Sequence, residues 1–271
     1  MRCIGILGGM SPSSTELYYG HLNRGVRSAL GGLHSADCLI RSVDFGEVEA
    51  LQVAGNWEGA GQMLAEAAAG LEAGGAELLI LATNTMHKVP PLPGPAALPE
   101  RCPAGATVCT RPTLLPDWVG SPAVRLQVAP AIREAISIPF LDIFAVTAEA
   151  VVGAGCARPA LMATAYTMEQ EFCLGRLREA GLAPVVPAAA ERAEIHRIIF
   201  EELCKGITTD ESRRTYEAIA AGLIEEGGAD GVILGCTEVG MLLNSHNVAA
   251  PVFDTTIIHC DATLAAALPD G

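Results

Sequence analysis

The sequence predicts an α/β fold of two pseudo-symmetric domains, each a parallel sheet flanked by helices, with the active site in the cleft between them. Two observations support this prediction. Short apolar runs rich in β-branched residues alternate with helical patterns, which is the order typical of parallel sheets covered on both faces. The chain also contains an internal repeat, and its 271 residues are enough for two ordinary domains.

The repeat aligns residues 74–84 with residues 227–237 without a gap. In each copy a glycine pair ends an Ala-rich helix, an acidic residue starts a strand, and the strand ends in a small polar or nucleophilic residue. Thr83 and Cys236 occupy these equivalent last positions. Any two strand-helix units of such a fold resemble each other, but agreement over the helix end, the strand and its tip favours duplication.

Eight strands are predicted in order along the chain. The first is the apolar run that ends at Gly8-Gly9, and the third and seventh follow the two repeated glycine pairs. The remaining strands are short apolar runs between helical patterns. The predicted strands are residues 3–7, 38–43, 77–82, 139–143, 160–163, 183–186, 231–235 and 250–253. We expect residues 1–145 to form the first half and residues 146–271 the second, with the last helix a candidate to pack on the first half.

Residues 90–127 interrupt this pattern. They hold roughly half of the chain's 17 prolines and show no sustained helical or strand period, so they cannot form a helix or a central strand. We interpret them as an insertion. Two origins remain open: a genuine surface loop, or a retained intron spanning Val89 to Gln127, since AAG-GTG can encode Lys88-Val89 and CAG-GTG can encode Gln127-Val128.

Composition excludes several classes of function. The net charge of −14 and the absence of a basic run argue against a nucleic-acid partner. No apolar stretch approaches the roughly 20 residues that span a membrane. Nine cysteines without a C-x-x-C spacing or a secretory signal predict reduced thiols and a cytoplasmic protein. The six histidines lack a metal-binding spacing, so no metal is expected.

Chemistry is expected just after the strands, because ligands of parallel α/β folds lie beyond the carboxyl ends of the strands. Racemising an amino acid requires one group on each face of the α-carbon. The paired tips predict this geometry, with Thr83 on one side and Cys236 on the other. A thiol, with a reference pKa of about 8.5, serves as acid or base near neutral pH, whereas a threonine hydroxyl is much weaker in both roles.

Five segments carry a resemblance to a known family. They are Gly5-Ile6-Leu7-Gly8-Gly9-Met10-Ser11, Thr83-Asn84-Thr85-Met86-His87, Tyr166-Thr167-Met168-Glu169-Gln170, Gly235-Cys236-Thr237-Glu238 and Pro251-Val252-Phe253-Asp254-Thr255-Thr256. Together they resemble the aspartate/glutamate racemase family over nearly the whole chain outside the insertion. The resemblance implies racemisation without pyridoxal phosphate by two facing cysteines, the first replaced here by Thr83. It therefore points to a subgroup linked to broad-range or L-specific glutamate and aspartate racemisation.

By this resemblance, Cys236 is the base for L-amino acids, and Thr83, alone or through a water, reprotonates the other face. No cofactor is expected: pyridoxal phosphate needs a Schiff-base lysine, and the chain's lysines, Lys88 and Lys205, lie in no recognisable cofactor motif. The resemblance also leads us to expect a homodimer, and the expected ligand is a small amino acid.

Polar residues beyond the strand tips are the candidate ligands of the substrate carboxylate, aided by backbone N–H groups at helix starts. They are Ser11, Asn84, Thr85 and Thr237, and the apolar Met10 beside Ser11 is a further candidate for substrate contact. Helix capping is the alternative role for several of them, Ser11 in particular. Gln52, by resemblance, occupies a site where aspartate-specific members carry an arginine.

Two residues close to the tips, His87 and Glu238, are candidates to tune the adjacent hydroxyl or thiol, with a purely structural role as the alternative. We interpret His259 as a packing or capping residue, and Cys38, Cys173 and Cys204 as core residues. Two other functions stay open: a single-cysteine decarboxylase or isomerase, and a degenerate amino-acid-binding protein.

Overall fold

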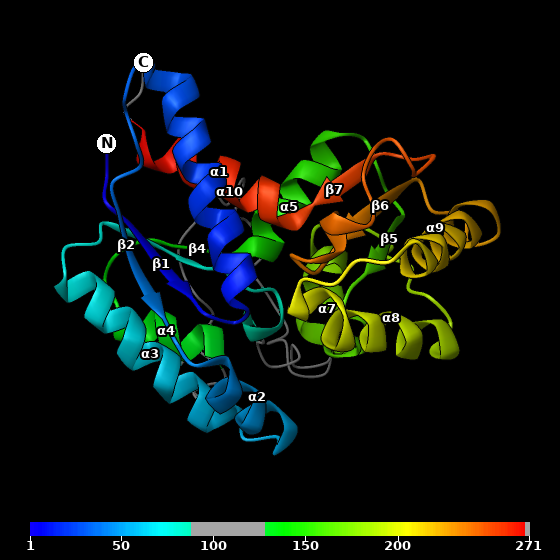
Figure 1. Cartoon of the computed structure of the whole chain (residues 1–271), viewed down its shortest axis with the longest axis horizontal. Coiled ribbons are helices and arrows are strands. Elements are labelled where there is room, and N and C mark those ends of the chain that lie inside the picture. Colours follow the sequence, from blue (N-terminus) through cyan, green and yellow to red (C-terminus); the bar gives the residue numbers. More distant parts are fainter. Residues whose placement is uncertain (88–127, 269–271) are drawn as a thin grey trace, which may run out of the picture.

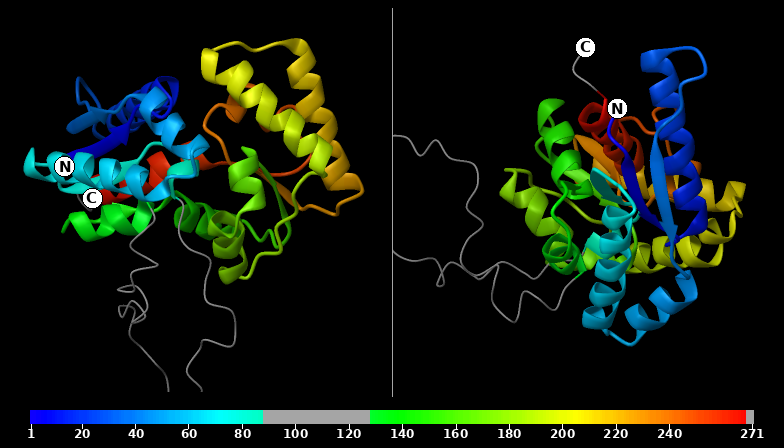
Figure 2. Two further views of the ribbon diagram at one scale, coloured as in Figure 1. Left: turned by 90° about the horizontal axis from the view of Figure 1, so that it is seen from below. Right: turned by 90° about the vertical axis from the view of Figure 1, so that its left-hand side faces the viewer.

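The computed structural model describes residues 1–87 and 128–268, so the predicted insertion at 90–127 lies outside the described residues. The α/β class is confirmed: one sheet has the strand order β2-β1-β3-β4 and the other β5-β6-β7, all parallel. Helices cover both sheets, and the two halves lie side by side (Figures 1 and 2). Within the described ranges, no helix has the length and apolar character needed to cross a membrane.

The first half is built from β1 (Ile4–Gly8), α1 (Pro12–Leu30), β2 (Cys38–Ser42), α2 (Phe45–Val53), α3 (Trp57–Ala73), β3 (Leu78–Leu81), the 3-10 helix η1 (Thr85–His87), α4 (Val128–Ala135) and β4 (Phe140–Leu141). The second half is built from α5 (Ile143–Gly153), β5 (Pro159–Met162), α6 (Ala165–Glu169), α7 (Glu171–Glu179), α8 (Ala189–Glu201), η4 (Leu203–Lys205), α9 (Asp210–Glu225), β6 (Gly231–Leu234), η5 (Val239–Met241), β7 (Val252–Asp254) and α10 (Thr255–Ala267).

The central strands of the first sheet, β1 and β3, are buried on both faces because helices cover both. Successive side chains of a strand point to opposite faces. Leu79 and Leu81 of β3 accordingly pack with α3 and α4, whereas Leu78 and Ile80 pack with α1 and α10. This double burial explains why β3 reads as a continuous apolar run and not as an alternating one.

The two sheets share one pairing register, which supports duplication. If residues 78 and 231 are equivalent, as in the sequence repeat, the pair Ile4–Leu78 corresponds to Pro159–Gly231. The same offset relates the β3–β4 pair Leu79–Phe140 to the β6–β7 pair Val232–Val252. The repeat therefore extends from one strand to three strands of each half.

The acidic residue that starts each repeated strand has the same structural task in both halves. Glu77 accepts a hydrogen bond from the backbone N–H of Cys3 at 2.8 Å, and Asp230 accepts one from that of Arg158 at 2.9 Å. Cys3 and Arg158 directly precede the equivalent strands β1 and β5. Each carboxylate thus satisfies a backbone donor at the entry to its neighbouring strand.

The helix that follows the last strand of each sheet packs against the other sheet. Ile143, Phe144 and Val151 of α5 belong to the core of the second half, while Cys260 and Leu264 of α10 belong to the cluster around α1 and β1. Figure 1 shows α10 running back alongside α1. The two sheets are therefore joined by a reciprocal exchange of helices. The division at residue 145 stays a prediction and falls inside α5.

Equivalent aspartates start the two exchanged helices. Asp142 caps α5 through the N–H groups of Phe144 and Ala145, and Asp254 caps α10 through those of Thr256 and Ile257. A side-chain oxygen at this position satisfies backbone donors that lack a partner within the helix.

One predicted strand is wrong in extent. Residues 183–186 form only an isolated parallel bridge, between Ala160 and Val185. Pro184 and Pro187 flank that bridge, and proline cannot donate a hydrogen bond to a strand ladder. The other seven predictions match a strand to within a few residues at each end.

Candidate active site

Three side-chain hydrogen bonds join the strand tips of the two halves. Ser11, after β1, donates from Oγ to Oε1 of Glu238 at 2.6 Å. Asn84, after β3, donates from Nδ2 to Oγ1 of Thr255 at 3.2 Å. The hydroxyls of Thr85 and Thr164 lie 3.3 Å apart. The carboxyl ends of both sheets therefore face each other across a closed junction, the cleft between the two halves, which is lined by Ser11, Asn84, Thr85, Thr164, Glu238 and Thr255.

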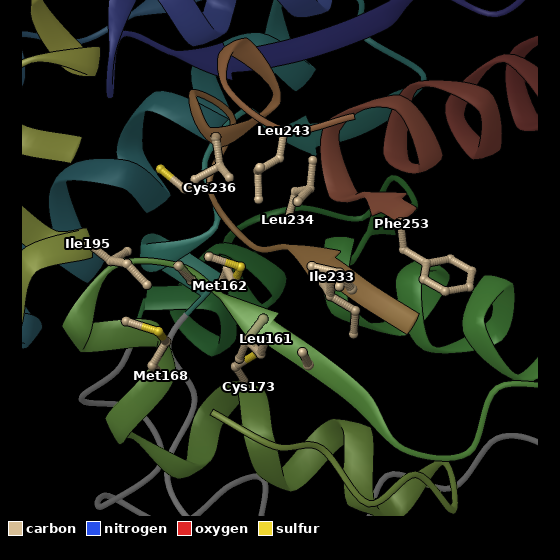
Figure 3. Close-up of a cluster of buried hydrophobic side chains, with 14 of the residues drawn as sticks. Leu161, Met162, Met168, Cys173, Ile195, Ile233, Leu234, Cys236, Leu243 and Phe253 are labelled. Carbon is tan, nitrogen blue, oxygen red and sulfur yellow. The ribbon is translucent and has the colours of Figure 1, made fainter. Parts of the chain in front are cut away.

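Cys236 lies at the end of β6, at the border of the hydrophobic core of the second half. Figure 3 shows its sulfur directed away from Leu234 and Leu243. The side chain is 9% exposed, and its Sγ donates to Oε2 of Glu238 at 3.0 Å. The thiol is thus buried, yet it is directed at a carboxylate rather than packed among apolar groups alone.

The surroundings of Cys236 keep the thiol protonated. Burial raises the pKa of Cys236 well above its ordinary value, and the charge and hydrogen bond of Glu238 raise it further. A thiolate is the form that removes a proton, so the neutral thiol needs an acceptor before it can act. Glu238 is in position to be that acceptor.

Glu238 organises the second tip. Its carboxylate is 3% exposed and accepts from Ser11, Cys236 and Thr237, with Thr237 bonding to the same oxygen as Cys236. The thiol of Cys204 lies 4.0 Å from the other oxygen. Cys204 was predicted to be a core residue, but it is only half-buried and contacts this polar cluster as well as the core.

Thr83 lies at the first tip with 7% of its surface exposed. Its backbone is fixed on both sides: its N–H donates to the carbonyl of Leu81 at 2.8 Å, and its carbonyl accepts from Nδ1 of His87 at 2.7 Å. The backbone N–H of Ile143 donates to the other ring nitrogen of His87 at 3.4 Å. The histidine is therefore the Nδ1–H tautomer, and it holds the backbone of Thr83.

His87 is neutral in the folded protein. Burial lowers its pKa to about 4, against a smaller raising effect of Asp142. The ring is fully buried, stacks on Phe140 and contacts the ring of His259. His259 is also fully buried, and its Nδ1 and Nε2 are bonded to the hydroxyl of Tyr18 and the carbonyl of Leu141. Both histidines support the fold around the first tip.

Asn84 has one orphan group. Its Oδ1 is buried and has no hydrogen-bond partner among residues 1–87 and 128–268, while its Nδ2 donates to Thr255. A buried acceptor without a partner carries an energetic cost, and a ligand that supplies a donor removes it. An amino-acid ammonium group is such a donor.

The remaining predicted ligands lie around the same cleft. Ser11 caps α1 by accepting from Ser14 at 3.2 Å, so its capping and cleft-facing roles coexist. Met10 beside it is 6% exposed. Gln52 in α2 is 7% exposed, donates to Sδ of Met86 at 2.8 Å, and borders a pocket of about 330 Å³ between α2 and the helices α6 and α8.

Sequence reasoning missed two residues of the cleft, Thr164 and Thr255. Thr164 follows β5 and also bonds to Thr167 at 3.2 Å, and Thr255 follows β7 and donates to the carbonyl of Leu234 at 2.8 Å. Both lie within two residues of the end of a predicted strand, so the rule that ligands lie beyond strand ends, applied to every strand, would have found them.

Comparisons with known proteins give one consistent result. The family described as Asp/Glu/hydantoin racemase matches residues 7–91 and 122–263. The chain is similar to the crystal structure of a candidate Asp/Glu racemase from Yersinia pestis, with 38% identity and a TM-score of 0.79, covering 99% of this chain and 100% of that one. It is also similar to PH1733, an aspartate racemase homologue from Pyrococcus horikoshii OT3, with 29% identity, a TM-score of 0.74 and coverages of 98% and 99%.

A third structure shares the fold at lower identity. Glutamate racemase from Francisella tularensis, in complex with D-glutamate, is 12% identical with a TM-score of 0.58, covering 98% of this chain and 80% of that one.

Proposed function

The chain belongs to the Asp/Glu/hydantoin racemase family. We propose that it racemises small α-amino acids without a cofactor, and that its substrates are of the glutamate and aspartate type or of a broader range. Cys236 removes the α-proton of the L-substrate, and Thr83 serves the opposite face. The observation that carries the proposal is the hydrogen bond of 3.0 Å from the Cys236 thiol to Glu238 at a tip equivalent to that of Thr83.

The proton balance starts from the neutral thiol. Cys236 gives its proton to Glu238, which leaves a thiolate and a carboxylic acid. The thiolate then takes the α-proton, which leaves a carbanion on the substrate. The hydroxyl of Thr83, or a water that it holds, then gives a proton to the other face of the carbanion and completes inversion. Glu238 returns its proton through solvent to the alkoxide or hydroxide left on the Thr83 side.

The carbanion needs donors around the substrate carboxylate, where negative charge develops. The hydroxyls of Ser11, Thr85 and Thr237 and the amide of Asn84 are the groups we assign to this role. Ser11, Asn84 and Thr85 bond across the cleft to Glu238, Thr255 and Thr164. Thr237 bonds to Glu238 within the second tip. Substrate binding therefore exchanges these internal bonds for bonds to the amino acid.

Glu238 and His87 take different supporting roles in this proposal. Glu238 touches the thiol and holds its proton, whereas His87 acts only through the backbone of Thr83. We place the enzyme in the cytoplasm, in line with cysteines that are free among the described residues. The homodimer expected from the family belongs to the same proposal.

The test is solvent-deuterium exchange at the α-carbon, followed by NMR, with a panel of L- and D-amino acids. Exchange with inversion supports a racemase. Exchange of L-substrates without inversion means that Cys236 removes and returns the proton on one face only. The weak acidity of the Thr83 hydroxyl on the other face would explain such a result. Release of carbon dioxide from malonate-type acids supports a decarboxylase, and binding without exchange of any substrate supports a binding protein and rejects catalysis.

A further inference from the structure

Three connections link the pocket beside Gln52 to the residues at the strand tips. Met86, which accepts from Gln52, lies in η1 just after Asn84 and Thr85. Tyr166, another lining residue, is two residues after Thr164, whose hydroxyl meets that of Thr85. A substrate held at the strand tips therefore has this pocket within reach of its side chain.

The third connection runs through Cys204. The thiol of Cys204 lies 4.0 Å from Oε1 of Glu238, and burial and the carboxylates of Glu238 and Glu49 raise the pKa of Cys204 to about 12. Glu49 lines the pocket and Glu238 holds Cys236. Cys204 therefore contacts the carboxylate that holds Cys236 and interacts electrostatically with one that lines the pocket.

The walls of the pocket combine aromatic surface with a neutral amide. Tyr166 meets His196 edge to face at 5.5 Å between ring centroids, and Phe200 lies 4.7 Å beyond His196. The Nδ1 of His196 accepts from the N–H of Ala165 at 3.3 Å, and burial lowers the pKa of this histidine. The ring is therefore neutral at pH 7, and it offers contact surface rather than a charge.

The cation among the lining residues is already compensated. Arg197 forms ion pairs with Glu194 at 2.8 Å and with Glu201 and Glu202 at 3.2 Å each. Glu201 and Glu49 line the pocket as well. The lining thus carries more negative than positive charge, and Gln52, its buried polar group, is neutral.

We propose that this pocket receives the side chain of the substrate and selects uncharged side chains with a hydrogen-bonding end over carboxylates. This inference rests on the proposed function and names the substrate class of the same site. An amide or hydroxyl end bonds to the Gln52 amide, and its methylene groups contact the rings. A carboxylate instead meets the carboxylates of Glu49 and Glu201, while Arg197, the cation among the described lining residues, is already paired. Like charges at close range are unfavourable. The volume of about 330 Å³ is at the lower end of small-molecule pockets, roughly 300–1,000 Å³.

L-glutamine and L-glutamate are the matched probes, since they have nearly the same shape and differ in charge. Exchange of the α-proton gives kcat/KM for each, and calorimetry gives their Kd values independently of turnover. We expect L-glutamine to be favoured by about tenfold or more in both measurements. Equal values, a preference for L-glutamate, or binding of neither amino acid overturns the inference.

Two substitutions test the pocket itself. Gln52→Arg should reverse the preference toward L-glutamate, whereas Ala50→Arg, which adds the same charge to the same helix outside the pocket lining, should leave it unchanged. Glu201→Gln is the second variant, in case arginine is not tolerated at the buried position 52. Glu201 is exposed, so this change should keep the fold intact. It should raise binding of L-glutamate relative to L-glutamine by severalfold, and no change would contradict the assignment.

The two hypotheses fail in different ways. Absence of exchange with every amino acid rejects the proposed racemase, while the calorimetric preference still decides the pocket. Exchange that favours L-glutamate supports the racemase and rejects the neutral side-chain subsite.

Discussion

At the end of β6 a thiol lies 3.0 Å from a carboxylate, whereas the equivalent end of β3 carries a hydroxyl followed by a neutral histidine. The two backbones enter these tips in the same register, so the difference lies in the side chains. Glu238 contacts the side chain of Cys236 directly, but His87 contacts only the backbone of Thr83. In the proposed reaction, the tip of Cys236 therefore carries the proton acceptor, whereas His87 only positions the backbone of Thr83.

The largest effect is expected from Cys236→Ser, which removes the thiol from the tip of β6. A serine hydroxyl does not ionise near neutral pH, so α-proton exchange from L-substrates should fall by about 100- to 10,000-fold. Deuterium incorporation measured by NMR checks this. Cys38→Ser, at a half-buried position of β2, is the matched control and should exchange normally. Substantial exchange by Cys236→Ser would mean that another group is the base.

The next largest effect is expected from Glu238→Gln. The charge and hydrogen bond of Glu238 raise the pKa of Cys236, so an amide should lower that pKa. The thiolate then forms at lower pH, and the rise of kcat/KM with pH should shift downward. The maximal rate should still fall, by about tenfold or more, since an amide cannot accept the proton.

Two measurements test this substitution: the pH profile of exchange and a titration of thiolate absorbance. Glu226→Gln, at an exposed position after α9, serves as the control. An unchanged titration midpoint in Glu238→Gln would remove Glu238 from the proton path.

A smaller effect, in the opposite direction, is expected from Thr83→Cys, which makes the two tips alike. An ionisable group on the missing face should raise inversion by about tenfold, most clearly from D-substrates. Enantiomers have equal free energy in solution, so a racemase has equal kcat/KM in both directions at equilibrium. An apparently L-only enzyme therefore exchanges without inverting, or saturates differently with the two enantiomers.

Chiral chromatography of products, run beside deuterium exchange, separates these cases for Thr83→Cys. Thr83→Ser, which keeps a hydroxyl, is the matched control. If the cysteine changes neither exchange nor inversion, Thr83 is not the second catalytic position.

The succession of most strands along the chain, the duplicated tips and the positions of Thr83 and Cys236 at those tips could be predicted from the sequence. They depend on local patterns of apolar residues and glycines, which are visible in short stretches of the chain. The prediction of a full strand at residues 183–186 was wrong because two prolines limit hydrogen bonding there, although the apolar run itself is present.

Contacts across the cleft were beyond sequence reasoning. The bond between Ser11 and Glu238 joins residues 227 positions apart, and it depends on how two complete halves are packed. The contact of Gln52 with Met86 is of the same kind. Local pattern thus predicts which residues lie at the tips, and packing decides how they pair.

The two tips differ, finally, in the chain segment that leads away from each of them. After η5 the chain reaches β7 through residues 242–251, in which Leu242 and Leu243 are buried. After η1 the described chain resumes at Val128, and Met86 and Val128 belong to the same hydrophobic cluster, with α4 packed against η1. The family match leaves out residues 92–121 between its two parts. The two flanks therefore already meet without the inserted residues.

Deleting Val89 to Gln127 should accordingly preserve folding and leave activity equal or higher, which is the smallest expected effect. Loop-closure free energy changes by only about 0.6 kcal/mol per doubling of loop length, so the free energy of unfolding should stay close to that of the full chain. Denaturant unfolding and α-proton exchange check this prediction. A Gly/Ser segment of equal length in place of residues 89–127 is the control, and it separates the effect of length from that of sequence. Insoluble protein after deletion would show that the segment is needed for folding. Sequencing of mature transcripts tests its origin: a segment present in every message argues for a genuine loop, and messages that lack it argue for a retained intron.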